Sequence, residues 1–297
     1  MSPRGAACTF CRMNILNQLS DAVSGVVSSL APSLVTVVGK RVNATAIPWD
    51  EHHLVTARHN LSKRRAPIVR LPDGTERQAE VVGRDGATDL ALLKIDHGLP
   101  VPSWADEGGR VGELVLALAR PGSSPQASLG MVTSVGDAWR TRHGGPVDRY
   151  LEVDAELPMG FSGGPLVGAD GSVLGLNTRG LLRGGATLPT PTVRRVLGQL
   201  EQHGEVRRHW LGLGLQPVED GLLVSLVAGG SPAEAGGVLV GDIVTHAGGT
   251  AVTRPTELAA VLSTSIGQAL ELQLIRGGQP ATVTVTPVEK PAARQAC

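Results

Sequence analysis

Short apolar runs alternate with turn residues along the first two thirds of the chain. The runs span residues 34–38, 54–57, 68–71, 90–95, 114–118, 129–135 and 173–176. Between them lie Pro72-Asp73-Gly74, Pro121-Gly122 and Asp170-Gly171. Many short strands at intervals of about 8–12 residues are typical of a barrel or sandwich rather than of alternating strands and helices.

One helix is predicted at the end of this region, over residues 190–203. Thr190 can cap it, Pro191 suits its first turn and Gly204 suits the position after its last turn. An apolar stripe follows the helical period at Val193, Val196, Leu197 and Leu200. The helix therefore marks the end of a first domain.

The remainder, to about residue 287, predicts a small α+β domain. Its candidate strands span residues 211–215, 222–227, 243–246, 270–275 and 281–285, and its main helix spans 256–264. We therefore expect an N-terminal tail or short helix over 1–29, domains over 30–203 and 204–288, and a tail over 289–297. Within the first segment, residues 1–12 are expected to form a loose tail.

Composition narrows the class. Apolar residues make up 41% of the 297 and aromatic residues only 2%, so the cores consist of Val, Leu, Ile and Ala. Basic and acidic residues balance at 27 each, which excludes the basic excess typical of nucleic-acid binders, and the basic run 63–65 is interpreted as a solvated loop. No apolar run approaches the ~18 residues of a membrane span, and no secretory signal is recognisable.

Cysteines predict neither a disulfide framework nor a metal site. Cys8, Cys11 and Cys297 all lie near the termini, outside the predicted cores. The Cys8-x-x-Cys11 spacing suits a metal or a redox pair, but no second Cys/His pair accompanies it, so exposed free thiols are expected. We expect no cofactor and no metal, and the cysteines are compatible with a reducing compartment without establishing one.

A glycine-rich segment, residues 160–166, offers a candidate nucleophile. Ser162 lies between Gly160-Phe161 and Gly163-Gly164, and these glycines allow a sharp loop. In such a loop the N–H groups of Gly160 and Ser162 can converge on one point, as an oxyanion requires. The alternative is an ordinary turn in a glycine-rich protein.

A serine nucleophile needs an imidazole base and a carboxylate that orients it. His59 directly follows the strand-like run 54–57, whereas His52 and His53 precede it and are expected to face solvent. These three histidines lack the further ligands that would indicate a metal site. Of the carboxylates, Asp89 adjoins the run 90–95 and is expected to be partly buried, and Asp85 is expected to be exposed.

Three strings, residues 54–59, 82–95 and 160–167, resemble those of the HtrA (Deg) family of serine proteases, and the similarity extends over about residues 30–287. The segment 173–178 is similar to the family's strand beside the substrate. The resemblance implies a mainly β fold, in which a trypsin-like double β-barrel protease domain precedes a small α+β PDZ domain. It also implies Ser162 as nucleophile, His59 as general base, Asp89 as orienting carboxylate, and Gly160 and Ser162 as the oxyanion hole.

Two positions depart from the family pattern. Phe161 stands where the family usually has Asn, and Asn43-Ala44-Thr45-Ala46 stands where a Gly-Ser-Gly run is usual. The oxyanion donors are main-chain groups, so the hole can survive the first change, but the Phe side chain must find cover. These departures motivate an alternative function, an inactive PDZ-containing scaffold or chaperone on a protease fold.

The C-terminal domain resembles the PDZ domain of HtrA proteases at Trp210-Leu211-Gly212-Leu213 and over residues 231–243. The resemblance implies that a partner's C-terminal segment adds a strand to a sheet edge, with its carboxylate at the loop formed by Leu211, Gly212 and Leu213. A purely structural β-domain is the alternative.

The resemblance implies an ATP-independent serine endopeptidase acting on unfolded or misfolded proteins, and no nucleotide-binding motif is present to contradict it. Relatives mostly work in the cell envelope, whereas the chain shows no export signal. The family commonly forms trimers through N-terminal aromatic residues, so a homotrimer is expected, although Phe10 is the only aromatic residue before Trp49.

Overall fold

The chain forms two units, Met1–Val206 and Arg207–Cys297. The computed structural model describes residues 8–62, 65–206, 209–262, 265 and 267–289. Lys63 and Arg64 of the basic run, the tail 290–297 and Cys297 lie outside these ranges. Among the described residues, no helix has both the length and the apolar character needed to cross a membrane.

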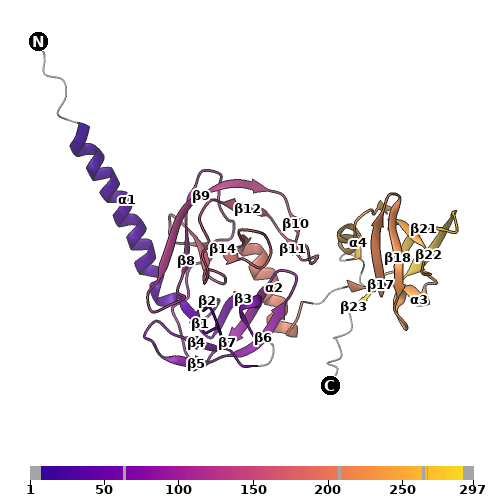
Figure 1. Ribbon diagram of the computed structural model, residues 1–297, viewed down its shortest axis with the longest axis horizontal. Coiled ribbons are helices and arrows are strands. Elements are labelled where there is room, and N and C mark those ends of the chain that lie inside the picture. Colours follow the sequence, from indigo (N-terminus) through magenta and orange to yellow (C-terminus); the bar gives the residue numbers. More distant parts are fainter. Residues whose placement is uncertain (1–7, 63–64, 207–208, 263–264, 266, 290–297) are drawn as a thin grey trace, which may run out of the picture. The chain divides into compact units, whose positions relative to one another are not determined.

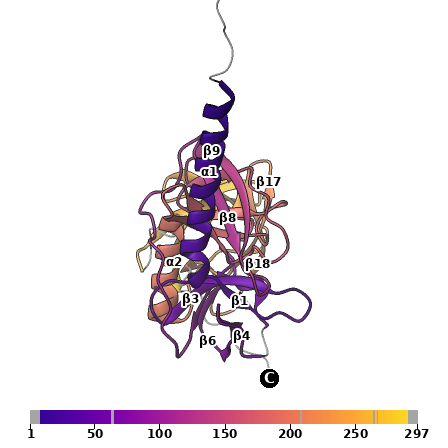
Figure 2. The ribbon, with the colours of Figure 1, turned by 90° about the vertical axis from the view of Figure 1, so that its left-hand side faces the viewer.

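Two antiparallel sheets build the first unit and lie as separate layers in two perpendicular views (Figures 1 and 2). The first has the order β5-β4-β1-β2-β3-β7-β6 and the second β12-β9-β8-β13-β14-β15. The strands of the first sheet are β1 (Val35–Val37), β2 (Ala44–Pro48), β3 (His53–Ala57), β4 (Ile68–Arg70), β5 (Glu76–Gln78), β6 (Glu80–Asp85) and β7 (Leu90–Lys94). Those of the second are β8 (Leu114–Ala119), β9 (Gln126–Gly136), β12 (Tyr150–Val153), β13 (Pro165–Gly168), β14 (Val173–Thr178) and β15 (Ala186–Pro189). A separate hairpin joins β10 (Trp139–Arg140) to β11 (Pro146–Val147).

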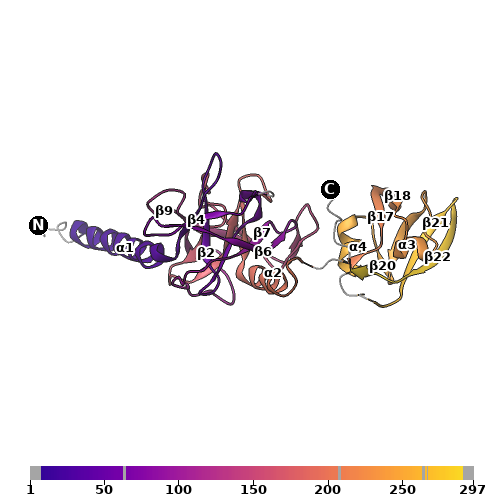
Figure 3. The same cartoon turned by 90° about the horizontal axis from the view of Figure 1, so that it is seen from below.

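Two α-helices belong to this unit. α1 (Cys8–Leu30) extends away from the sheets in Figures 1 and 3, and it includes residues 8–12, where the sequence predicts a loose tail. The helix ends at the buried Leu30 and is followed by the 3₁₀ turn Ala31–Ser33. α2 (Thr190–His203) confirms the predicted helix, and Gly204 ends it at a φ of 73°, donating its N–H to Leu200 O.

The prediction that Thr190 caps α2 is wrong. Thr190 is the first residue of the helix, and its hydroxyl donates to Val173 O at 2.9 Å instead. The residue before it, Pro189, makes no side-chain cap. The buried hydroxyl thus ties the start of α2 to the start of β14.

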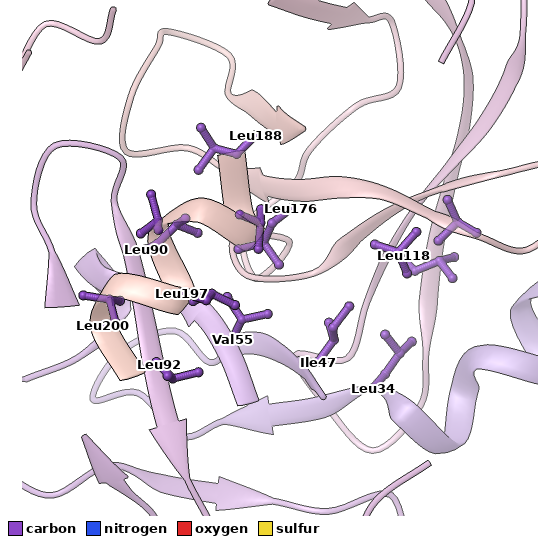
Figure 4. Close-up of a cluster of buried hydrophobic side chains, with 14 of the residues drawn as sticks. Leu34, Ile47, Val55, Leu90, Leu92, Leu118, Leu176, Leu188, Leu197 and Leu200 are labelled. Carbon is purple, nitrogen blue, oxygen red and sulfur yellow. The ribbon is translucent and has the colours of Figure 1, made fainter. Parts of the chain in front are cut away.

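The core between the two sheets is made of aliphatic side chains. α2 packs on strands of both sheets, namely β6 and β7 of the first sheet and β14 and β15 of the second. Its four-residue apolar stripe is completely buried, which confirms the helical pattern. Figure 4 shows the side chains that meet there: Leu34, Ile47, Val55, Leu90, Leu92, Leu118, Leu176, Leu188, Leu197 and Leu200. Because these side chains come from both sheets and from α2, one continuous core fixes the seam between the sheets.

The second unit has a sheet of order β17-β18-β19-β21-β22, with β20 paired to β19 and a separate pair β16–β23. Its elements are β16 (His209–Trp210), β17 (Leu213–Val218), β18 (Gly221–Val227), α3 (Pro232–Ala235), β19 (Ile243–Ala247), β20 (Thr250–Ala251), α4 (Pro255–Leu262), β21 (Leu270–Arg276), β22 (Gln279–Val285) and β23 (Val288–Glu289). The predicted strands and helix of this region are therefore present. The unit has its own aliphatic core, to which α4 contributes Leu258 and Leu262.

Candidate active site

His59 lies just after β3, in the 3₁₀ turn Arg58–Asn60. Buried apolar residues anchor β3, whereas the His59 side chain keeps 37% of its surface exposed, so the ring is held at the edge of the fold with access to solvent. Its Nδ1 lies 2.6 Å from Asp89 Oδ2. Because a carboxylate oxygen can only accept, Nδ1 carries the proton and Nε2 keeps a lone pair, which is what a general base requires.

Asp89 is held in place by its backbone and by three hydrogen bonds. It is the one described residue other than glycine with a positive φ, at 60°, and its side chain is 6% exposed. Oδ1 accepts the His59 backbone N–H at 3.0 Å, and Oδ2 accepts the Thr178 hydroxyl at 2.5 Å besides the imidazole. A strained backbone that the surroundings maintain is characteristic of functional sites.

The Ser162 loop presents two main-chain donors. Gly160 has a φ of 98°, a conformation that favours glycine, and both Gly160 and Ser162 are buried. Phe161 N–H between them donates to Pro158 O, but within the described ranges neither the Gly160 N–H nor the Ser162 N–H has an acceptor. Since buried N–H groups are almost always paired, two free ones in a single loop indicate a place where an oxygen of a bound molecule is received.

The end of β14 touches all three side chains of the candidate triad within three consecutive residues. Thr178 bonds the Asp89 carboxylate, and Arg179 N–H donates to Ser162 Oγ at 3.1 Å. A Cβ placed on Gly180 would lie 2.4 Å from Asp89 Oδ2 and 2.9 Å from His59 Nδ1, so only glycine fits there. In addition, Asn60, the residue after His59, donates from Nδ2 to Ser162 O at 3.2 Å. These contacts bring His59, Asp89 and Ser162 together at the seam between the two sheets.

Ser162 Oγ accepts the Arg179 N–H, and the described residues show no hydrogen bond between that oxygen and His59. The bond to Arg179 uses a lone pair of the hydroxyl oxygen and leaves its hydrogen available to another acceptor.

The side chain of Phe161 is 2% exposed and packs in the core of the second sheet with Val132, Leu151 and Leu166. The sequence predicts that other side chains must shield this ring from water, and this prediction is confirmed. Its burial holds the middle of the loop while the flanking residues present their N–H groups.

Asp85 was expected to be exposed, and that prediction is wrong, because its side chain is buried at 3% exposure. It accepts the N–H groups of Ala87 and Thr88 and the Thr88 hydroxyl, which satisfies the buried carboxylate and fixes the turn that leads to Asp89.

The expectation of solvent-facing histidines holds for His52, whereas His53 is half-buried and its Nδ1 lies 2.8 Å from Asp50 Oδ2. Among the described residues, Asp50, His53 and Glu201 have ligand atoms within 4.8 Å of one another, the spacing of a metal site. Asp50 and His53 approach each other through the hydrogen bond between them, which explains two of the three members of the cluster. None of the three residues belongs to the candidate triad.

In the second unit, β17 lies at the end of the sheet order and pairs with β18 alone among the described strands, with α4 packed near it. Leu211 is 3% exposed, so it offers its main chain and not its side chain, whereas Leu213 is half-buried. Gly212 O accepts Ala228 N–H, and Leu211 O accepts Ala233 N–H. Hydrogen bonds to its carbonyls thus hold the loop before β17. Among the described residues, no acceptor is bonded to the N–H group of Leu211 or of Gly212.

Sequence reasoning missed Thr178, the Arg179 N–H and Thr45, which bonds the Ser162 loop. The only signal for Thr178 was its place in the string 173–178. A main-chain donor such as the Arg179 N–H cannot be predicted from the sequence, because every residue except proline has a backbone N–H.

Comparisons with known proteins agree with this architecture. The trypsin-like peptidase domain family matches residues 42–176, and the PDZ domain family matches residues 210–286. A probable periplasmic serine endoprotease, DegP-like, of Rhizobium meliloti is 36% identical over 259 residues, covering 80% of this chain and 51% of that protein. A protein of the same description from Brucella suis is 32% identical over 261 residues, covering 80% and 50% respectively. The chain therefore spans about half the length of these curated relatives.

Solved structures are similar over nearly the whole chain. The serine endoprotease from Yersinia pestis superimposes with a TM-score of 0.72 at 28% identity, covering 90% of this chain and 97% of that one. The HtrA-type protease AlgW, solved with a decapeptide, gives a TM-score of 0.73 at 26% identity, covering 91% and 99%.

Proposed function

Because the chain belongs to the HtrA/DegP-like family of serine proteases, with a trypsin-like peptidase domain and one C-terminal PDZ domain, we propose that it is an ATP-independent serine endopeptidase. Its substrates are unfolded or misfolded proteins, and its PDZ domain recognises C-terminal peptide segments. The observation that carries the proposal is the contact of residues 178–180 with the Asp89 carboxylate, the His59 ring and the Ser162 hydroxyl.

The proposed mechanism assigns a role to every group of the site. Ser162 Oγ attacks the scissile carbonyl carbon while its proton passes to His59 Nε2, and Asp89 stabilises the imidazolium through Nδ1–H. The negative charge that develops on the carbonyl oxygen is received by the N–H groups of Gly160 and Ser162. His59 then protonates the leaving amine, which breaks the peptide bond, and water hydrolyses the acyl-enzyme with the same base.

Casein degradation tests the proposal. Wild-type protein should degrade unfolded casein without ATP, and Ser162→Ala should abolish this while the protein stays folded. Ser172→Ala is the matched control, because Ser172 bonds a surface turn at Asp170 and touches none of the proposed catalytic groups. Casein degradation that persists in Ser162→Ala would end the proposal.

The inactive scaffold is the competing function, and a fluorophosphonate probe separates the two. Labelling that maps to Ser162 supports the enzyme, and its complete absence from folded protein with peptide present supports the scaffold. The hydrogen bond between Asp89 and His59 and the two free N–H groups of the Ser162 loop favour the enzyme.

We assign peptide capture to the edge of β17 beside α4, with the peptide carboxylate at the N–H groups of Leu211 and Gly212. A peptide with a hydrophobic C-terminus should bind the full chain, and its C-terminal amide should bind at least about tenfold more weakly, because a charge-assisted hydrogen bond is lost. Equal binding of acid and amide would contradict this assignment.

We also propose a homotrimer. On α1, Ile15 and Leu19 lie one helical turn apart and are 64% and 42% exposed, and an apolar helix face of this kind suits contact with further copies. Sedimentation velocity on the 30.7 kDa chain tests this, and a monomer at micromolar concentration would refute it.

A further inference from the structure

We propose that Thr45 is a positioning residue for the oxyanion hole, and that its hydroxyl fixes the Gly160 end of the Ser162 loop. Thr45 is the second residue of β2 and is completely buried. It belongs to the segment Asn43–Ala46, one of the two places where the sequence departs from the family pattern. The inference rests on the proposed protease function and adds a residue to its machinery.

Two polar groups of Thr45 reach the Ser162 loop. Its hydroxyl donates to Gly160 O at 2.8 Å, and its backbone N–H donates to Ser162 O at 3.2 Å. One strand residue therefore holds the carbonyls of both residues whose N–H groups form the proposed hole.

The orientation of the Thr45 hydroxyl is itself determined. Its oxygen accepts the backbone N–H of Arg120 at 2.9 Å, so its single hydrogen is committed to Gly160 O. Arg120 is 7% exposed and donates to the carbonyls of Ala31, Pro72 and Ser123. The Thr45 hydroxyl is thus held between the Arg120 N–H, which it accepts, and the Gly160 carbonyl, to which it donates.

This hydroxyl matters because glycine has the backbone that rotates most easily. A glycine at a φ of 98° has the widest choice of conformations, and a rotation about its own bonds would turn its N–H away from the oxyanion position. Because that N–H must stay unpaired to receive substrate, the loop cannot use it as an anchor. The Gly160 carbonyl shares a rigid peptide unit with the Phe161 N–H, which donates to Pro158 O. The Thr45 hydroxyl adds a second hydrogen bond to this unit and restrains Gly160 from its other side.

The alternative, a purely structural Thr45, makes a different prediction, since its hydroxyl would then affect folding but not turnover. If Thr45 positions the oxyanion hole, its loss should lower kcat with little change in KM, because the oxyanion exists in the transition state and not in the bound substrate. Losing an oxyanion donor outright costs about 10²–10³-fold in kcat, and a loosened donor should cost less.

The test compares Thr45→Val, Thr45→Ser and Thr190→Val in the full chain, with a chromogenic peptide substrate. Thr45→Val keeps the side-chain shape and should lower kcat about 10–100-fold with KM changed less than about threefold. Thr45→Ser keeps the hydroxyl and should retain kcat within about threefold. Thr190→Val removes another buried hydroxyl, which donates to Val173 O away from the Ser162 loop, and should leave kcat unchanged.

A peptide boronate supplies an independent readout, because its tetrahedral adduct on serine places an oxygen in the hole. Its affinity for Thr45→Val should weaken by the same factor as kcat/KM falls. If Thr45→Val does not fold, Thr45→Cys replaces it, since a thiol is a weak donor of similar size, and kcat should be intermediate.

Two results would overturn the inference: a kcat of Thr45→Val within twofold of wild type, or equal losses in Thr45→Val and Thr190→Val. Failure of the proposed function is recognised separately, because wild-type protein would then neither cleave casein nor react with the fluorophosphonate.

Discussion

Replacing Asp89 by Asn tests the most detailed feature of the site, the direction of the hydrogen bonds around the imidazole. The carboxylate accepts three donors: the His59 backbone N–H, the His59 Nδ1–H and the Thr178 hydroxyl. An Asn side chain has one oxygen that accepts and one NH₂ that can only donate. The substitution therefore leaves the shape of the side chain unchanged and reverses one of its two hydrogen-bonding ends.

The backbone decides which way the amide turns. The His59 N–H cannot rotate, so the amide oxygen must take the Oδ1 position, and the NH₂ then faces His59 Nδ1. Nδ1 must give up its proton to accept, which moves the proton to Nε2. The Thr178 hydroxyl rotates at little cost, but His59 in this tautomer has no lone pair for the Ser162 proton.

The expected loss in kcat is about 10⁴-fold, the effect of holding the wrong tautomer in a serine protease triad. This corresponds to about 5 kcal/mol in the activation free energy, at 1.36 kcal/mol for each factor of ten. Peptide hydrolysis and the rate of fluorophosphonate labelling should fall together, and ¹⁵N NMR of the ring should show the proton on Nε2.

Asp148→Asn is the control, since it removes a carboxylate that accepts from Thr192 and Arg195 in the same unit without touching His59. Its kcat should match wild type. A folded Asp89→Asn variant that keeps a tenth or more of wild-type kcat would refute the reasoning about the tautomer.

Three further predictions follow from particular contacts. Phe161→Ala empties a buried site and should lower the free energy of unfolding of the first unit by about 3–5 kcal/mol in denaturant titrations, and a loss below about 1 kcal/mol would contradict its place in the core. Gly180→Ala puts a methyl group 2.4 Å from Asp89 Oδ2, so kcat should fall more than about tenfold, and unchanged turnover would show that the β14 end is not packed as described. Hydrogen bonds from Arg276 hold the pKa of Asp242 below its usual 3.8, so this pair stabilises the second unit above that pH and the contribution disappears as the carboxylate protonates. Arg276→Met should therefore destabilise that unit at pH 7, with a difference from wild type that shrinks towards pH 3, and a difference independent of pH would count against the ion pair.

The sequence determined those features that depend on local pattern. The apolar runs predicted β1, β3, β4, β7, β8, β9 and β14 in the first unit and β17, β18, β19, β21 and β22 in the second. The helical period with Gly204 predicted α2, because the spacing of apolar residues shows directly which face of an element is buried. The glycines around Ser162 likewise identified the loop, since only glycine tolerates its backbone.

The tertiary structure alone decided what depends on partners far apart in the chain. Three features could not be predicted from local pattern: the burial of Asp85, the Thr190 hydroxyl that bonds Val173 instead of capping α2, and strands such as β2, which no apolar run indicated. The same holds for the contacts of Thr45 and Thr178 with the site, which join residues separated by 115 and 89 positions. Threonine in a strand ordinarily reports β-propensity, and only the packing of two sheets against each other turns these two hydroxyls toward Gly160 and Asp89.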